Sequence, residues 1–208
     1  MNNEPLYPVV KLYPGKDDAV RRFHPWIFSG AIQHVAEGVQ AGDTVTVIDH
    51  QGNILGTGFC ESDSIAVKML SFENSKIDEW FFLDKLKHAL EVRRTMGLLD
   101  NPHTNCYRLV HSEGDGLAGL IIDIYGPTAV VQAQTEGMAL HLKEIVRALK
   151  LMPKLGLQAV YNKSAEAMRR MGKEDLVEDG YLLGEAINEW VVENDSRFHV
   201  DWENGQKT

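Results

Sequence analysis

The apolar residues of this chain change their spacing once, near residue 74, and this change constrains the fold more than any other feature. Before it, short segments of β-branched and aromatic residues are separated by glycines. The expected strands cover residues 8–13, 44–49, 54–59 and 64–72, with a hairpin turn at 51–53. Short strands that bend at glycines indicate a small, strongly curved β-barrel. We therefore expect a barrel domain over residues 1–73.

Beyond residue 74 the spacing becomes helical. Apolar side chains recur every three or four residues over 78–96, and Gly97 follows at the position of a helix C-cap. The polar pair Asn74 and Ser75 supplies the expected start. The segment predicts one long amphipathic helix just after the domain boundary.

The remainder of the chain alternates between strands and helices. Two more helices are expected, at 137–151 and at 164–171, the second with Ser164 as its N-cap. The expected strands cover residues 108–112, 119–125, 129–134, 158–161, 180–184, 189–193 and 197–201, with a hairpin turn at 194–196. The fold class is therefore predicted as α+β, in which a second α/β domain of strands packed with helices occupies residues 74–208.

Composition indicates an ordinary globular protein. The 208 residues are 44% hydrophobic and 25% charged, and no segment approaches the ~20 apolar residues of a membrane span. The N-terminus has no basic region followed by an apolar run, so we expect a cytoplasmic location and no membrane partner. Cys60 and Cys106 have no neighbouring cysteine, which predicts reduced thiols.

Charge is distributed unevenly along the chain. Residues 11–34 contain four basic and two acidic side chains and sum to +2. The whole chain has a net charge of −9, so the residues outside this segment sum to −11. A basic edge on an acidic body is compatible with a specific RNA contact, and chance would produce it equally well. The candidate RNA-binding residues at this edge are Lys11, Lys16, Arg21, Arg22 and His24.

The segment 21–32, RRFHPWIFSGAI, combines this charge with aromatic residues. Arginines that bind phosphate, beside aromatics that anchor a small barrel or stack on bases, would suit an RNA-binding surface. The alternative is a buried Trp-Ile-Phe wedge with ordinary surface arginines. Of these roles, we expect Trp26 to be a barrel anchor rather than a stacking platform.

No complete catalytic constellation is found in the sequence. Residues 114–119 match G-x-G-x-x-G, but the following segment 120–125 is strand-like, so a hairpin turn is favoured over a nucleotide site. Glu113 and Asp115 flank that turn, and turn chemistry accounts for Asp115. The histidines are not at ligand spacing, and the two cysteines are expected to be buried small hydrophobes. We therefore predict no catalytic residue, no cofactor-binding residue and no metal site in this chain.

Three blocks of the sequence resemble bacterial S-adenosylmethionine-dependent methyltransferases that make 5-methylcytosine in large-subunit rRNA. They are Arg22–Gly30, Arg108–Gly126 and the tail containing Glu193–Asn194, Phe198–Asp201 and Gly205–Thr208. The resemblance implies that the first domain is a PUA domain, a small RNA-binding β-barrel, and that the second is the family's central α/β domain. It also implies a third, Rossmann-type domain with the cofactor and the catalytic cysteine, which we expect to be absent from this chain.

This resemblance implies an RNA-recognition and positioning part of an rRNA (cytosine-C5) methyltransferase, with rRNA as its partner and a homodimer left open. S-adenosylmethionine is implied for the full-length enzyme and no cofactor for this chain, which alone is predicted to be inactive. The segment 162–170 departs from the family pattern, which leaves the role of the central domain open. Two other hypotheses remain: a stand-alone RNA-binding or assembly module, and a small-molecule enzyme that uses the 114–119 turn.

We predict that the chain does not bind S-adenosylmethionine, because its glycine-rich segment is not followed by a helix. Calorimetric titration with the cofactor should therefore give a flat isotherm, and incubation with RNA should give no methylated product. Micromolar binding would contradict the domain assignment.

Overall fold

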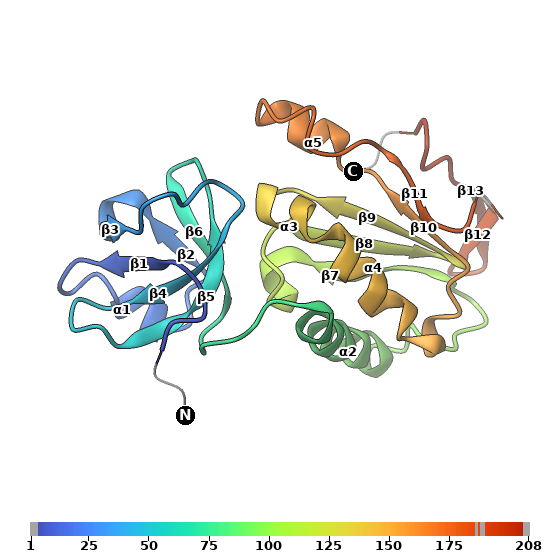
Figure 1. Ribbon diagram of the computed structural model, residues 1–208. Coiled ribbons are helices and arrows are strands. Elements are labelled where there is room, and N and C mark those ends of the chain that lie inside the picture. Colours follow the sequence, from blue (N-terminus) through green and yellow to red (C-terminus); the bar gives the residue numbers. More distant parts are fainter. Residues whose placement is uncertain (1–3, 186, 188–189, 206–208) are drawn as a thin grey trace.

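Two mixed β-sheets lie side by side in the computed structural model, which describes residues 4–185, 187 and 190–205 (Figure 1). The first sheet uses residues 9–71 and the second residues 106–183, and a separate two-stranded hairpin follows. The molecule is therefore of mixed α/β class, with a sheet-rich first domain. Among the described residues, no helix has the length and hydropathy of a membrane span.

The first sheet curls into a barrel. Its strand order is β2-β6-β5-β4-β1-β3, and the two edge strands are consecutive in the chain, joined by the short 3-10 helix η1. Alternating residues such as Val45 and Val47 fill the interior, which confirms the expected strand pattern. The elements are β1 (Val9–Leu12), α1 (Asp18–Arg21), β2 (Trp26–Phe28), η1 (Ser29–Ala31), β3 (Ile32–Val35), β4 (Thr44–Ile48), β5 (Ile54–Cys60) and β6 (Ile65–Ser71).

The predicted hairpin at 51–53 is confirmed, and Asp49 organises it. The Asp49 carboxylate accepts hydrogen bonds from the backbone amides of Gln51 and Asn53, both at 2.9 Å. Gly52 has a φ of 94°, a left-handed conformation that favours glycine. Asp49 is therefore the buried residue that fixes this turn rather than the last residue of the strand.

The second domain places helices on one face of a five-stranded sheet of order β11-β10-β9-β8-β7 (Figure 1). Helices α2 and α4 pack against each other and contribute Phe82, Leu86 and Ile145 to the large core that covers this face. The elements are α2 (Glu79–Thr95), β7 (Cys106–His111), η2 (Ser112–Asp115), β8 (Leu120–Tyr125), β9 (Thr128–Ala133), α3 (Glu136–Leu140), α4 (Leu142–Lys150), η3 (Pro153–Leu155), β10 (Ala159–Asn162), α5 (Ala165–Arg170), β11 (Gly180–Leu183), β12 (Trp190–Glu193) and β13 (Ser196–His199).

The C-terminal segment covers part of the opposite face of this sheet. Trp202 is 2% exposed and packs on Val130 and Tyr161, and its ring stacks on Tyr125 at 6.1 Å between centroids. Its indole N–H donates to the Tyr181 hydroxyl at 3.0 Å. The rest of this face is left open.

Three expected element ends differ from the structure. The long helix begins after Asp78, whose carboxylate accepts from the amides of Trp80 and Phe81, and not at Asn74 and Ser75. Residues 137–151 form two helices, α3 and α4, that meet at His141. Ser164 is not a side-chain cap, because its hydroxyl accepts from the Ala133 amide and donates to Asn162. The expected start of the penultimate strand, Glu189, and the tail 206–208 lie outside the described residues.

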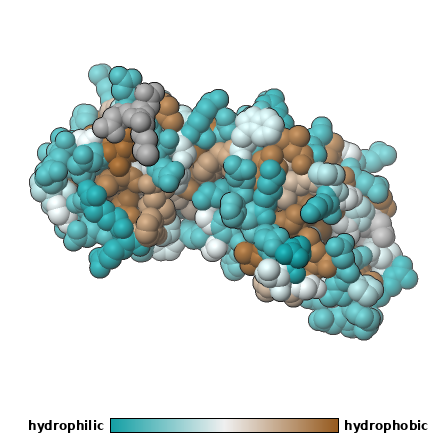
Figure 2. Space-filling model, turned by 90° about the horizontal axis from the view of Figure 1, so that it is seen from below, coloured by the Kyte–Doolittle hydropathy of each residue, from teal (hydrophilic) through white to brown (hydrophobic). Residues whose placement is uncertain are grey.

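The two domains share a core. Phe59, on β5 of the first domain, is fully buried within the core of the second domain, as is Leu70 from β6 at 2% exposure. The Phe59 ring lies against Gly137, where a Cβ atom would overlap it, and 4.8 Å from the ring of His141. The two lobes accordingly form a continuous surface with a narrow waist (Figure 2).

The connecting segment 73–77 is held by hydrogen bonds. The Ser75 amide donates to Thr57 Oγ1 at 3.2 Å, and the Ile77 amide donates to the Tyr7 hydroxyl at 2.8 Å. Ile77 itself is 7% exposed and lies in the large core. These contacts tie the segment to both domains, and the exact division between residues 73 and 74 stays a prediction.

A buried ion pair fixes the start of the second sheet to helix α2. The Arg93 guanidinium donates to both carboxylate oxygens of Asp115, at 2.5 and 2.8 Å, and to the carbonyl of Arg108 at 2.8 Å. The two side chains are only 10% and 7% exposed. Because water is excluded, loss of one partner would leave an uncompensated charge inside the protein.

We expect Arg93→Ala to lower the free energy of unfolding by roughly 3–5 kcal/mol, the cost of a broken buried ion pair. The neighbouring Arg94 is the matched control, because its pair with Glu91 is 59% and 58% exposed. Arg94→Ala should cost less than about 1 kcal/mol. Urea unfolding compares the two, and equal losses would contradict this account.

Glu61 is a second buried charge, at the waist between the domains. Its side-chain Oε1 has no hydrogen-bond partner among the described residues, and the residue is 9% exposed. Burial raises the pKa of its carboxyl to about 7; Lys68 opposes this shift, and the carboxylates of Asp63 and Glu136 add to it. The ionised form is therefore unfavourable in the folded protein.

Because the folded pKa of Glu61 lies above the unfolded value of 4.5, folding is penalised increasingly as pH rises from 4.5 to about 7. Glu61→Gln removes this penalty, so it should stabilise the protein at pH 8 by roughly 2 kcal/mol more than at pH 5. Urea unfolding at both pH values measures the difference. The exposed Glu37→Gln is the control, and a pH-independent effect of the Glu61 substitution would refute the assignment.

Candidate nucleic-acid interface

The five residues expected to bind RNA all lie on the first domain, but they differ in availability. Lys11 is half-buried on β1, beside His34 of β3. Lys16 is exposed in the turn that follows β1, and Arg22 and His24 are exposed between α1 and β2. Arg21, Arg22 and His24 therefore share the segment that runs from the end of α1 to β2, whereas Lys11 lies on strand β1.

Arg21 is bound by two carboxylates. Its guanidinium donates to Asp17 at 2.5 Å and to Asp49 at 2.7 Å, and Asp49 is almost completely buried. The hydrogen bond from Arg21 holds the pKa of the Asp17 carboxyl below its usual value. Arg21 thus connects α1 to the 51–53 turn, and its charge is largely neutralised where it stands.

Arg22 differs from its neighbour. Its Nε donates to the carbonyl of Asp18 at 3.2 Å, and it makes no ion pair with any residue that the structure describes. A solvent-exposed guanidinium with free donors is suited to bind a phosphate. Of the two arginines, Arg22 is therefore the one positioned for a nucleic-acid backbone.

The aromatic residues beside these cations face solvent. Strand β2 alternates outward, inward and outward, so Ile27 is 2% exposed whereas Trp26 is 36% and Phe28 51% exposed. The expectation that Trp26 anchors the barrel is wrong, and Ile27 has that role. The period-two pattern after Pro25 was the sequence signal that could have shown it.

Phe23 is the most exposed of these aromatics, at 71%. Its backbone φ is 64°, a left-handed conformation that a phenylalanine rarely adopts, and its ring meets Phe72 edge-on at 5.2 Å. Residues held in sparsely populated backbone conformations cluster at active sites and ligand clamps. Exposed rings beside a free guanidinium can stack on bases while the cation binds the phosphate.

This surface continues onto the second domain. The Trp26 indole N–H donates to Glu113 Oε1 at 2.9 Å, across the waist. Burial raises the pKa of the Glu113 carboxyl, but hydrogen bonds from Ser112 and Trp26 outweigh it, so the pKa is lowered overall. Glu113 is therefore ionised and fixes the orientation of the Trp26 ring.

The glycine-rich segment 114–119 is confirmed as a turn. It follows the 3-10 helix η2, Gly116 is left-handed with a φ of 67°, and the chain then enters β8 instead of a helix. The Asp115 carboxylate accepts hydrogen bonds from Arg93, and the Glu113 carboxylate accepts them from Trp26 and Ser112. The pair of carboxylates is structural rather than catalytic in this arrangement.

The remaining candidates for chemistry are not activated. Burial raises the pKa of both the Cys60 and the Cys106 thiols, which is the opposite of what a nucleophile needs. Within the part of the chain that is described, no group of three His, Cys, Asp or Glu side chains is arranged to hold a metal ion.

Comparison with known proteins supports the expected family. Residues 10–72 match the family model of the PUA-like domain. Over 96% of this chain, the large-subunit rRNA methyltransferase I of Alteromonas mediterranea is 38% identical, and that of Shewanella frigidimarina is also 38% identical. The resemblance to large-subunit rRNA methyltransferases is confirmed.

The match covers only part of those proteins. The chain spans about half the length of the curated relatives that it matches, 50% of each of the two above. Among solved structures, a putative SAM-dependent methyltransferase from Streptococcus mutans superposes with a TM-score of 0.73 at 16% identity, over 91% of this chain and 47% of that one. At this identity the superposition shows a shared fold alone.

Proposed function

We propose that this chain is the RNA-recognition and positioning part of an S-adenosylmethionine-dependent rRNA (cytosine-C5) methyltransferase. The observation that carries the proposal is the coincidence of two findings: the PUA-like match over residues 10–72, and the exposed cation and aromatic rings within it. The substrate would be rRNA, because the relatives are named large-subunit rRNA methyltransferases. In this proposal the chain contributes by binding rRNA and does not itself form or break a covalent bond.

The methyl donor would be bound elsewhere. The glycine-rich segment 114–119 does not fit a nucleotide-type cofactor, since β8 follows it and no helix N-terminus is available for a negatively charged group. The relatives are about twice as long as this chain, which leaves room for a cofactor domain in proteins of this kind. The homodimer, the cytoplasmic location and the boundaries of both domains stay predictions.

A stand-alone RNA-binding or assembly module is the second candidate. It would use the same exposed surface, and it differs only in having no catalytic partner. To distinguish the two, the substitutions that weaken RNA binding are placed at the equivalent positions of a full-length relative, and its methyl transfer to rRNA is measured. Only a positioning role predicts that weaker RNA binding reduces methylation.

The interface is tested by replacing its free cations. Lys16→Gln with Arg22→Gln should weaken binding to a labelled large-subunit rRNA fragment by roughly 1–3 kcal/mol and reduce the salt slope by about two, because two phosphate contacts are lost. Arg21 is retained, since its removal would leave the buried Asp49 without its cation. Fluorescence anisotropy at several salt concentrations measures both quantities.

Two further variants make the test selective. Phe28→Ala should lower affinity and leave the salt slope unchanged, because stacking releases no counterions. Arg147→Gln with Lys150→Gln makes the same charge change on α4 of the second domain and should bind like the parent. If the Lys16 and Arg22 variant binds as tightly as this control at every salt concentration, the proposed interface is wrong.

A further inference from the structure

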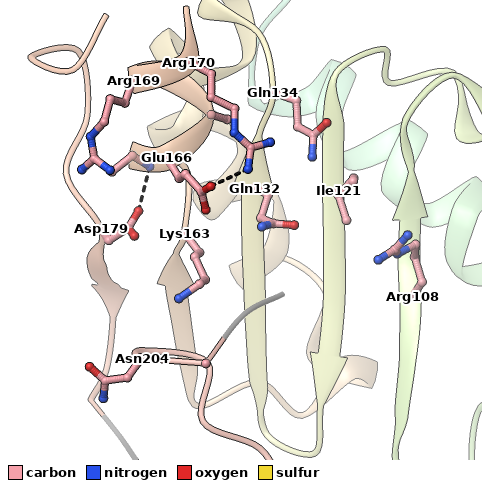
Figure 3. A pocket seen from close by; sticks show the side chains of 13 residues that line it. Arg108, Ile121, Gln132, Gln134, Lys163, Glu166, Arg169, Arg170, Asp179 and Asn204 are labelled. Atoms are coloured by element: carbon pink, nitrogen blue, oxygen red, sulfur yellow. Dashed lines mark hydrogen bonds and ion pairs between the residues drawn. The ribbon is translucent and has the colours of Figure 1, made fainter. Parts of the chain in front are cut away.

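The open part of the second sheet forms a groove that the first domain's interface does not use. It has a volume of about 510 Å³, within the ~300–1,000 Å³ usual for ligand sites. Side chains from three strands form its floor, helix α5 forms one wall and residues 204–205 form the other (Figure 3). The groove lies on the face opposite helices α2 and α4, beside the segment covered by Trp202.

The floor of the groove is polar, which is unusual for the face of a central sheet. Gln132 on β9 lies opposite Ile121 on β8, and Arg108 on β7 lies opposite Asp123. Arg108 donates to Asp123 at 2.9 Å and is one-third exposed. Gln134 extends the row at the end of β9. The two amide groups thus follow one another along the line of β9, and the Arg108 guanidinium lies two strands away, beyond Ile121 (Figure 3).

The lining as a whole is positively charged. Four cationic side chains, Arg108, Lys163, Arg169 and Arg170, line the groove against two carboxylates, Glu166 and Asp179. With Asp123, which pairs with Arg108, the groove still has a net positive charge, whereas the whole chain carries −9. An acidic protein with a positively charged groove attracts a polyanion to that groove.

Two of these cations have no carboxylate partner. Arg170 pairs with Glu166, but Arg169 makes no ion pair with any residue in the described ranges. The Lys163 ammonium donates to the carbonyl of Glu203 at 2.8 Å, which leaves two of its three N–H groups for another acceptor. Lys163 and Arg169 are therefore the groups able to bind phosphate.

The wall that carries these cations is fixed in place. Ser164 donates to Asn162 at 2.5 Å and accepts from the Ala133 amide at 2.8 Å, and all three residues are buried. The Ala165 amide donates to Asp179 at 2.8 Å, which ties α5 to the segment before β11. A buried network of this kind holds α5 against the sheet, so the groove needs little reorganisation on binding.

We propose that this groove is a second RNA-binding surface, which takes a single-stranded segment with its phosphates on Lys163 and Arg169 and its bases over Gln132 and Gln134. Asn and Gln side chains form paired hydrogen bonds with base edges. A protein partner would require an apolar centre, and the described residues of the lining include no apolar side chains besides Ile121, Ala165 and Ala167. The proposal rests on the proposed function in its choice of RNA, and its residues are independent of the first interface.

The test uses the whole chain and a fluorescein-labelled single-stranded RNA of mixed sequence, roughly 12 nucleotides long. Lys163→Gln with Arg169→Gln should weaken binding about tenfold and reduce the salt slope by about two. Lys163→Arg with Arg169→Lys keeps both charges and should bind like the parent. Arg147→Gln with Lys150→Gln, on the solvent-exposed side of α4 and on the other side of the sheet from the groove, should change the affinity less than about twofold. Circular dichroism and thermal unfolding establish that each variant is folded.

The outcomes separate this proposal from the first one. If the groove variant binds like the α4 control while the Lys16 and Arg22 variant loses affinity, the groove proposal is overturned and the proposed function stands. The reverse pattern supports the groove and overturns the first interface. Equal binding by all variants overturns both. Independent losses that multiply in the combined variant support both surfaces.

Discussion

The burial of Phe59 against Gly137 is the contact on which the rest of the structure depends. One ring from the barrel is fully enclosed by the core of the second domain, and only a residue without a Cβ allows the α3 backbone to approach it. The two domains therefore do not move independently about a flexible linker. Their relative position is set by hydrophobic burial, which is the dominant favourable term in folding.

This fixed relation makes the electrostatic arrangement meaningful. Trp26 is oriented by Glu113 of the other domain, and Arg93 with Asp115 holds the same turn against α2. If the two proposed surfaces bind RNA, the acidic remainder of the chain favours them, because repulsion from the remaining surface weakens every other binding mode. Rigid placement of both surfaces would let one RNA molecule gain from both contacts without the entropy cost of ordering the protein.

Most regular elements could be predicted from the sequence because they depend on local pattern. The strands 44–48, 54–60 and 120–125 follow short runs rich in β-branched and other apolar residues, bounded or bent by glycines, and α2 follows a clear helical period. The short β2 and β3 were missed, since three or four residues of mixed polarity give no readable period. The resemblance supplied the domain types that pattern alone left open.

The candidate sites were less predictable, because they depend on tertiary contacts. Nothing local to Arg21 indicates that its partner is Asp49, and nothing near Trp26 indicates Glu113. The groove joins residues from three strands, helix α5 and residues 204–205, which are distant in sequence, so no local pattern around Lys163 or Arg169 indicates that they line a groove. Burial of Phe59 in the neighbouring domain is likewise invisible to any window along the chain.

The docking of Phe59 on Gly137 also has a consequence for biosynthesis. A barrel of this kind would ordinarily close as soon as it leaves the ribosome, since domains fold as units from the N-terminus. Here β5 cannot bury its largest side chain until α3 has been made, well after the barrel's own last strand. We expect the nascent barrel to expose an apolar ring during this interval, so its final packing waits for translation of the second domain.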